Sequence, residues 1–387
     1  MKKITILALH LGTGGAEQFI SSLANILSEE NEVEIISTYK LNENPAFSIN
    51  PKVNIKYLIT DMKPNREELQ KALHEMKILS FIREGIKSFK ILRLRRKLMI
   101  DAIKKCDSDI IISTRIMHNK WLGKYGRADA IKIAQEHNHH NRNNDTILKT
   151  VKSLKNINYF MPTSKELTEF YARHLNEKKI KCVYLPHWVD FFPDEDMVSD
   201  LNHNTLITVG RLSKVKGFLD LIDVFKLVHE IDNSMKLNIV GDGEERENIE
   251  KKINDYELAD SIILCGNKSR NELNELYSSS DLYVMTSYSE SFGLVLLEAE
   301  SFKLPLIAFD SAQGAHEIIE NGKNGFFIKR RNKELMAKKI IDIMHDSELR
   351  ERLGNAGREM AAKYKLENVS AEWNNFIRNI CEENEED

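Results

Sequence analysis

Residues 204–241, NTLITVGRLSKVKGFLDLIDVFKLVHEIDNSMKLNIVG, decide the fold class of this chain. NTLITV and KLNIV are short β-rich runs, and the segment FLDLIDVFKLVHEI between them carries apolar residues at helical spacing. A strand followed by a helix and then by another strand predicts an α/β fold, with a parallel sheet and helices on its faces. The same alternation continues to LPLIAF at residues 304–309 and also fills the first half of the chain, from KITILAL onward.

The length of 387 residues predicts two domains, because it exceeds the size at which a single core stops growing. The alternation of strands and helices lapses over residues 185–204, where prolines and acids gather. We therefore expect two doubly wound domains, an N-terminal one over residues 1–190 and a C-terminal one over residues 200–365. A last helix, over about residues 366–387, is expected to pack back on the first domain.

The composition indicates a globular cytoplasmic protein, with 42% hydrophobic and 30% charged residues and no apolar run long enough to span a membrane. Cys106, Cys182, Cys265 and Cys381 lie far apart and show neither metal-ligand spacing nor a disulfide framework. The opening MKKITILALHLGTGGA resembles a signal peptide in part. A strand that runs into a glycine loop is favoured, because His10 and the early glycines shorten the apolar stretch.

The net charge of -3 conceals two oppositely charged halves. Residues 1–190 contain 32 lysines and arginines against 21 acids, and the excess concentrates in residues 87–105, KSFKILRLRRKLMIDAIKK. This helix suits an anionic membrane surface at the inner face of the cell membrane, and an amphipathic helix packed on its own domain is an equal alternative. Nucleic acid is disfavoured, because no recognised binding module accompanies the charge.

Candidate ligand-binding residues directly follow the predicted strands, because parallel sheets bind ligands at the carboxyl ends of their strands. In GRLSKVKG, Arg211 and Lys216 lie between a strand and a helix that starts near Phe218. Two cations beside a helix N-terminus suit a diphosphate, although solvated surface cations are the alternative. Gly241 and Gly243 in GDGEE allow a close backbone turn, which is weak evidence by itself.

The segment SYSESFGLVLLEAES, residues 287–301, places acids within an apolar run. Glu290 falls in the loop after a strand, and Glu298 lies on an apolar face of the helix that follows. A buried carboxylate needs strong hydrogen bonds, and a ribose diol would supply two donors. Glu300 has Lys303 at i+3, so we expect an ordinary surface ion pair there.

These motifs together resemble the retaining glycosyltransferases of the GT-B fold, in particular family 4. The resemblance spans nearly the whole chain: GTGGAEQ, EHNHH, TSKEL, LPHWVD, GRLSKVKG, VGDGEE, a Glu-x7-Glu element from Glu290 to Glu298, and GAHEIIENGKNGF. The combination is specific although each piece is not. It implies two Rossmann-like domains that face each other across a cleft, with a nucleotide-sugar donor bound by the second and a glycan acceptor by the first.

The resemblance also implies roles for single residues. Arg211 and Lys216 would bind the donor diphosphate and stabilise the leaving group without a metal or another cofactor. Glu298 would bind the ribose hydroxyls, and Glu290 would bind those of the transferred sugar and take part in catalysis. The remaining donor contacts implied are the helix-start backbone of Phe292, Gly293 and Leu294, the loop glycines Gly14, Gly15 and Gly241, and, near the base, Asn267.

His137 follows the predicted strand IKIAQE, at a position where related enzymes present a histidine to the donor sugar. It is the candidate in the first half for orienting the sugar or relaying a proton. His139 and His140 share the loop, so the sequence leaves open which ring faces the site. A metal cluster is disfavoured, because three histidines within four loop residues do not readily converge on one ion.

The predicted function is transfer of a hexosyl or N-acetylhexosaminyl group from a nucleoside diphosphate sugar, with UDP preferred, to a glycan acceptor. We expect a lipid-linked acceptor in bacterial capsule, exopolysaccharide or lipopolysaccharide synthesis, reached from the cytoplasm at the membrane surface. A non-catalytic partner subunit and a sugar-nucleotide epimerase are alternatives, disfavoured by the intact set of Arg211, Lys216, Glu290 and Glu298. Ser291 stands where many relatives carry glycine, which leaves the identity of the sugar open.

Overall fold

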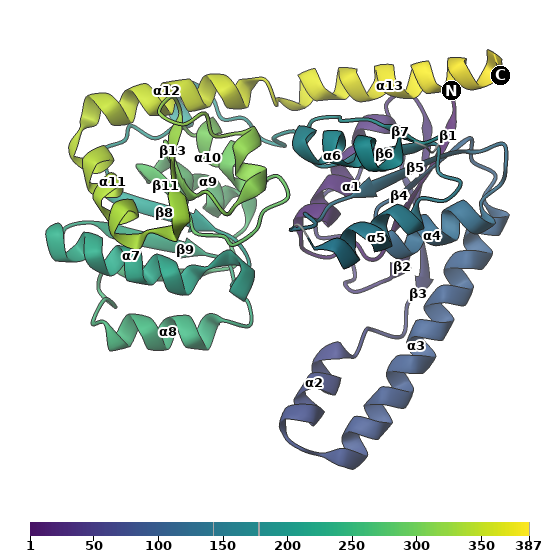
Figure 1. Cartoon of the computed structure of the whole chain (residues 1–387), viewed down its shortest axis with the longest axis horizontal. Coiled ribbons are helices and arrows are strands. Elements are labelled where there is room, and N and C mark those ends of the chain that lie inside the picture. The colour runs from purple at the N-terminus through teal and green to yellow at the C-terminus, as the bar shows by residue number, and fades with distance from the viewer. Residues whose placement is uncertain (142, 177–178, 387) are drawn as a thin grey trace. The chain divides into compact units, whose positions relative to one another are not determined.

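The computed structural model describes residues 1–141, 143–176 and 179–386, and it contains two compact units (Figure 1). Unit 1 comprises Met1–Leu185 and Ser370–Asp387, and unit 2 comprises Pro186–Val369. Each unit holds one parallel sheet with helices on its faces. The predicted doubly wound α/β class is confirmed.

Unit 1 has a seven-stranded sheet in the order β3-β2-β1-β4-β5-β6-β7. Its central strands are buried along almost their whole length and most of their residues are apolar, as expected of strands covered on both faces. Its strands are β1 Lys3–Ala8, β2 Glu32–Tyr39, β3 Asn54–Ile59, β4 Ile110–Ser113, β5 Ile131–Glu136, β6 Tyr159–Pro162 and β7 Lys181–Cys182. Its helices are α1 Gly15–Leu27, α2 Arg66–His74, α3 Ile78–Lys105, α4 Ile116–Tyr125, α5 Asn144–Ser153 and α6 Lys165–Leu175.

Unit 2 has a six-stranded sheet in the order β10-β9-β8-β11-β12-β13. Its strands are β8 Thr205–Val209, β9 Lys236–Val240, β10 Ile262–Gly266, β11 Leu282–Met285, β12 Leu306–Phe309 and β13 Gly325–Ile328. Its helices are α7 Phe218–Ile231, α8 Arg246–Asp255, α9 Arg270–Ser278, α10 Leu294–Ser301, α11 Lys333–His345 and α12 Ser347–Ala362. Alternate strand residues enter two cores, so that Leu206 packs with α7 and α11 whereas Ile207 packs with α10.

The last helix, α13 (Leu366–Glu386), contributes side chains to unit 1. Trp373 is buried and meets the ring of Phe19 edge-on, with a centroid distance of 6.1 Å. Further along, the carboxylate of Glu383 accepts a hydrogen bond from the hydroxyl of Tyr159 and pairs with Lys181.

The basic segment 87–105 forms the larger part of α3, and its two ends lie in different environments. Met99 and Ile103 are buried against the sheet of unit 1, so the interpretation as a packed amphipathic helix is right for the carboxyl-terminal part. Toward its other end the helix exposes apolar side chains, including Phe89, which is 65% exposed. Among the described residues, no helix is long and apolar enough to cross a membrane.

The expectation of a surface ion pair between Glu300 and Lys303 is wrong. Glu300 is fully buried, and its Oε1 accepts a hydrogen bond of 2.6 Å from the amide of Asn324. Lys303 pairs with Glu351 instead. The burial comes from α12, where a side-chain carbon at Gly357 would lie 3.2 Å from Oε1 of Glu300, so a glycine lets the two helices approach closely.

Replacing Glu300 with glutamine should stabilise the chain at neutral pH. Burial raises the pKa of Glu300 well above its ordinary value of 4.5. The stability contributed by the protonated group is therefore full below pH 4.5 and is lost as the pH rises through the raised pKa. In urea titrations we expect the wild type to lose unfolding free energy as the pH rises above the ordinary pKa of 4.5, and Glu300→Gln to show a flatter profile. The exposed Glu359, changed to glutamine, is the control, and equal pH profiles for all three proteins would contradict the assignment.

Candidate active site

The predicted donor residues of unit 2 lie at the point where its strand order reverses. The chain proceeds from β8 to β9 and β10 on one side, and returns to β11 on the other side of β8. β8 and β11 pair directly, with Tyr283 opposite Ile207. Doubly wound sheets bind ligands at this reversal, because the loops after the two neighbouring strands diverge there. The loop after β8 carries Arg211 and Lys216, and the loop after β11 carries Glu290.

An ion pair joins these two loops. The Nζ of Lys216 lies 2.6 Å from Oε1 of Glu290, and the hydroxyl of Ser287 donates to the same oxygen at 2.7 Å. The side chains of Lys216 and Glu290 are 23% and 11% exposed, so water screens the pair only in part. A cation and a carboxylate, both predicted from the sequence, are thus brought together at the sheet edge.

Close backbone contact between the loops makes this pair possible. Gly217 has φ +68°, and a side-chain carbon there would lie 2.2 Å from the backbone oxygen of Thr286. The hydroxyl of Thr286 donates to the backbone oxygen of Gly217 at 3.0 Å. Gly314, after β12, donates its backbone N–H to the backbone oxygen of Glu290, also at 3.0 Å. The loops after three neighbouring strands of the sheet, β8, β11 and β12, therefore fix the position of Glu290.

Arg211 lies on the same loop as Lys216, and its side chain is exposed. In the described part of the chain, the structure records no salt bridge to Arg211, which leaves its guanidinium available to an anionic ligand. Gly241 supports the same loop from behind, because it has φ +127° and a side-chain carbon there would lie 2.1 Å from the backbone oxygen of Gly210. The predicted turn at Gly241 is thus a packing requirement of the Arg211 loop.

Glu298 is buried in α10 and has protein partners that the sequence did not reveal. Arg270, the first residue of α9, donates to its Oε1 at 2.9 Å, and the hydroxyl of Tyr277 donates to Oε2 at 3.3 Å. The charge of Glu298 is the main factor that raises the pKa of Arg270. Burial raises the pKa of Tyr277 well above its ordinary value. The carboxylate is therefore held in a fixed orientation before any ligand arrives.

The start of α10 presents backbone rather than side chains. Gly293 has φ +95° and precedes the helix, which begins at Leu294. The ring of Phe292 is buried 4.8 Å from the ring of His187, so its side chain serves the core. Asn267 is exposed beyond the carboxyl end of β10, at the same sheet edge.

In unit 1 the glycine loop precedes α1, which begins at Gly15. Gly14 has φ +150°, and a side-chain carbon there would lie 2.4 Å from Oε2 of Glu17. The carboxylate of Glu17 in turn accepts a 2.6 Å hydrogen bond from Arg115, which follows β4. This ion pair, with Glu17 buried and Arg115 26% exposed, was not predicted. Glu17 lies in the first turn of α1, the helix after β1, and Arg115 follows β4, so both lie where the strand order of unit 1 reverses.

The three histidines after β5 are in different environments. His139 is buried and shares a 2.9 Å contact between its Nδ1 and the side-chain oxygen of Asn141. His140 is buried with its ring 4.4 Å from that of Phe170. His137 is half-buried, with its ring edge-on to Phe19, and remains the best placed of the three to meet a ligand. No group of three metal-ligating side chains forms anywhere in the described residues.

Arg331, after β13, connects the loops of unit 2 and was not predicted from the sequence. Its side chain is 18% exposed, its guanidinium donates to the carboxylate of Asp220 at 2.5 Å, and it stacks 3.7 Å from the ring centroid of Tyr288. It also donates to the backbone oxygens of Thr286 at 2.8 Å and Ser287 at 3.1 Å, and to the hydroxyl of Ser311 at 2.8 Å. The loop that carries Glu290 is therefore tied down through Arg331.

The acid in this cluster stays ionised. Burial acts to raise the pKa of Asp220, but hydrogen bonds from Lys333, Arg331 and Tyr288 outweigh it and lower the pKa to about 2. The contact between Arg331 and Asp220 is thus maintained over the whole range of pH in which an enzyme assay would be run.

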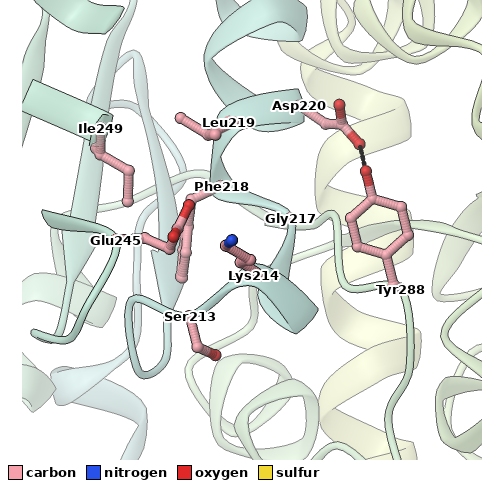
Figure 2. A pocket seen from close by; sticks show the side chains of 9 residues that line it. All are labelled: Ser213, Lys214, Gly217, Phe218, Leu219, Asp220, Glu245, Ile249 and Tyr288. Atoms are coloured by element: carbon pink, nitrogen blue, oxygen red, sulfur yellow. Dashed lines mark hydrogen bonds between the residues drawn. The ribbon is translucent and has the colours of Figure 1, made fainter. Parts of the chain in front are cut away.

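A cavity of about 250 Å³ lies beside the start of α7, and Figure 2 shows its lining. Lys214, Asp220 and Tyr288 line it, with the hydroxyl of Tyr288 hydrogen-bonded to Asp220. Lys216 instead lines a separate small pocket together with Glu290. The two lysines of one short 3-10 helix, Lys214–Lys216, therefore face different pockets.

A family model described as glycosyl transferases group 1 matches residues 194–360, which include all the unit 2 residues discussed above except His187. Residues 194–360 belong to this family. The chain is a glycosyltransferase, and the family is retaining.

Similarity to individual glycosyltransferases extends over the whole chain. An uncharacterized glycosyltransferase of Haemophilus influenzae is 24% identical, with 97% of this chain and 100% of that protein aligned. The amylovoran biosynthesis glycosyltransferase AmsD of Erwinia amylovora is 25% identical, with 94% and 96% aligned. A mutant of S. aureus TarM, in a crystal structure with fondaparinux, alpha-GlcNAc-glycerol and UDP, superimposes with a TM-score of 0.77 at 16% identity, covering 97% and 99% of the two chains. This last likeness shows the GT-B fold.

Arg331→Lys should impair the transferase through the Glu290 loop. Lysine keeps the charge next to Asp220, but it lacks the planar fork that reaches two loops at once. We expect kcat/KM for the donor to fall by about 10- to 100-fold, since small misplacements of binding groups are costly, while affinity for UDP stays close to wild type. Arg330→Lys, at the exposed neighbouring position, is the control. Equal kinetics for the two variants, or a parallel loss of UDP affinity, would refute a positioning role.

Proposed function

We propose that the protein transfers a hexosyl or N-acetylhexosaminyl group from a UDP-linked sugar to a lipid-linked glycan acceptor. The observation that carries this proposal is the 2.6 Å pair of Lys216 and Glu290 at the reversal of the unit 2 sheet, with the exposed guanidinium of Arg211 on the same loop as Lys216. A diphosphate needs cations, and a sugar needs hydrogen-bond acceptors for its hydroxyls. This site offers both on adjacent loops.

Arg211 and Lys216 would stabilise the negative charge that develops on the diphosphate as the bond between the sugar C1 and the phosphate oxygen breaks. Glu290 would accept hydrogen bonds from the sugar hydroxyls and hold C1 in place. The acceptor hydroxyl attacks C1 from the face that the diphosphate leaves, and its proton passes to the leaving phosphate oxygen. No enzyme nucleophile is required, and the configuration at C1 is retained.

Glu298 and Asn267 complete the proposed donor site on the nucleoside side. Because Arg270 and Tyr277 already orient the carboxylate of Glu298, it can accept hydrogen bonds from a ribose without rearranging. The proposed donor contacts from unit 1 are the backbone of the Gly14 loop and the half-buried ring of His137.

The proposed acceptor is a lipid-linked glycan in the synthesis of a bacterial surface polysaccharide. AmsD acts in amylovoran biosynthesis, and it aligns with this chain over nearly the full length of both. The cationic segment 87–105 adds an attraction toward anionic membranes. UDP is preferred as the carrier because the TarM crystal structure contains it.

A donor screen in EDTA tests the proposal. Purified protein is incubated with UDP- and GDP-sugars and a glycan acceptor, and release of the nucleoside diphosphate is measured. We expect turnover of one UDP-sugar without metal. Lys216→Met should lower kcat by about 100- to 1,000-fold, the usual cost of losing a group that stabilises transition-state charge.

Lys214→Met is the matched control, because Lys214 lies on the same 3-10 helix but faces the other pocket. It should turn over the donor like the wild type. The proposal fails if every donor is inert, if EDTA abolishes turnover, or if the two lysine variants behave alike while both remain folded by circular dichroism.

A further inference from the structure

The hairpin formed by α2 and the first half of α3, residues 66–92, concentrates exposed apolar side chains in a short stretch of the chain. Figure 1 shows it extending away from the sheet of unit 1. Of the eighteen large apolar side chains that are exposed in the described part of the chain, nine lie in this hairpin. They are Leu73, Met76, Ile78, Leu79, Phe81, Ile82, Ile86, Phe89 and Leu92.

Part of this surface forms one continuous stripe along α3. Ile78, Ile82, Ile86 and Phe89 follow each other at intervals of four, four and three residues, so their side chains share one face of the helix. They are 73%, 52%, 55% and 65% exposed. Contiguous exposed apolar surface of this kind marks an interaction site.

The inner side of α3 is already occupied, so the stripe is not a remnant of incomplete packing. The side-chain amide of Asn65, just before α2, donates to the backbone oxygen and the carboxylate of Glu84, each at 2.9 Å. Ala72 of α2 is buried, and Ile91 of α3 is buried in the core formed with β2 and β3. The outward stripe is therefore surplus to the folding of the hairpin.

Cations continue the same face of α3 where the apolar stripe ends. Arg93 lies four residues beyond Phe89, and Lys97 lies four residues beyond Arg93. Lys90, Arg93 and Lys97 are exposed, and within the described ranges the structure records no salt bridge to any of them. From Ile82 to Arg93 the helix rises about 16 Å. Along the helix axis, the apolar side chains therefore lie nearer the tip of the hairpin and the cations lie nearer the sheet.

This order matches the cross-section of an anionic bilayer surface. Apolar side chains of interfacial helices enter roughly 5–10 Å below the headgroups, while lysines and arginines contact the phosphates. A second copy of the chain fits less well. Residues 75–105 carry ten lysines and arginines against three acids, so two identical hairpins would bring like charges together. Nucleic acid would engage the cations but leave the apolar stripe in water.

We propose that the α2–α3 hairpin docks on an anionic lipid surface, with its apolar stripe in the interface and Lys90, Arg93 and Lys97 on lipid phosphates. The relevance of docking to a lipid-linked acceptor rests on the proposed function, but docking itself needs neither donor nor acceptor. From the sequence, membrane binding was assigned to the cationic residues 87–105. The proposed docking surface also includes the hairpin tip, because the exposed apolar side chains lie over residues 73–92, and the carboxyl-terminal part of 87–105 is packed on the sheet.

Cosedimentation of the full-length protein with vesicles tests the inference. The vesicles consist of phosphatidylcholine alone or mixed with the anionic lipid phosphatidylglycerol. We expect wild-type binding to the anionic vesicles and loss of about tenfold or more in affinity when Ile82→Ser and Phe89→Ser are combined. Arg93→Gln with Lys97→Gln should reduce affinity for anionic vesicles by a similar factor and weaken its dependence on salt.

The control combines Leu148→Ser with Ile231→Ser, which are exposed to 52% and 63% and thus match Ile82 and Phe89 at 52% and 65%. It should bind like the wild type. The inference is overturned if the wild type does not bind anionic vesicles, or if the control and hairpin variants lose the same affinity for them. It is also overturned if the wild type is a dimer and the Ile82/Phe89 variant is a monomer.

Turnover of the donor with a water-soluble acceptor, measured without vesicles, separates this inference from the proposed function. The Ile82/Phe89 variant should retain that turnover, which shows that it is folded. If the wild type binds vesicles but turns over no donor, the proposed function is contradicted and the docking surface is still supported.

Discussion

The ion pair between Lys216 and Glu290 is the interaction on which the proposed active site of this glycosyltransferase depends. It spans two loops that the sheet places side by side. β8 and β11 are neighbours in the sheet, although their last residues, Val209 and Met285, are 76 positions apart in the sequence. The pair forms only because the backbones touch, which requires glycine at position 217 opposite Thr286. The chemistry thus follows from a topological feature, the reversal of strand order, and from the absence of one side chain.

A second set of contacts makes the pair rigid. Arg331, which follows β13, donates to the backbone of the Glu290 loop, and Asp220 keeps Arg331 in place because its pKa of about 2 leaves it ionised. Arg270 does the same for Glu298. Each predicted acid therefore has an arginine, distant in sequence, that orients it or its loop, as expected of a site that must be organised before substrate binds.

The strand-helix alternation was sufficient to predict the doubly wound fold. The rule that ligands bind after the strands pointed to the loops of Arg211, Lys216 and Glu290, and their roles, implied by the family resemblance, stay predictions. Residues that act through tertiary contacts could not be found in this way. Nothing local distinguishes Arg331 from Arg330, and Glu300 looked like a surface residue because its burial comes from α12, some fifty residues away. The sequence predicted the basic helix but not which part of it is packed, because the spacing of its apolar residues does not show where contact with the sheet ends.

A double-mutant cycle on Lys216 and Glu290 tests the central claim most directly. The quantity to measure is kcat/KM for the donor in the wild type, Lys216→Met, Glu290→Gln and the double variant. If the pair acts as one unit, the double variant should be about as impaired as the worse single variant, because groups that work together are strongly non-additive. Losses that multiply would show that the two side chains act independently, and would contradict the account.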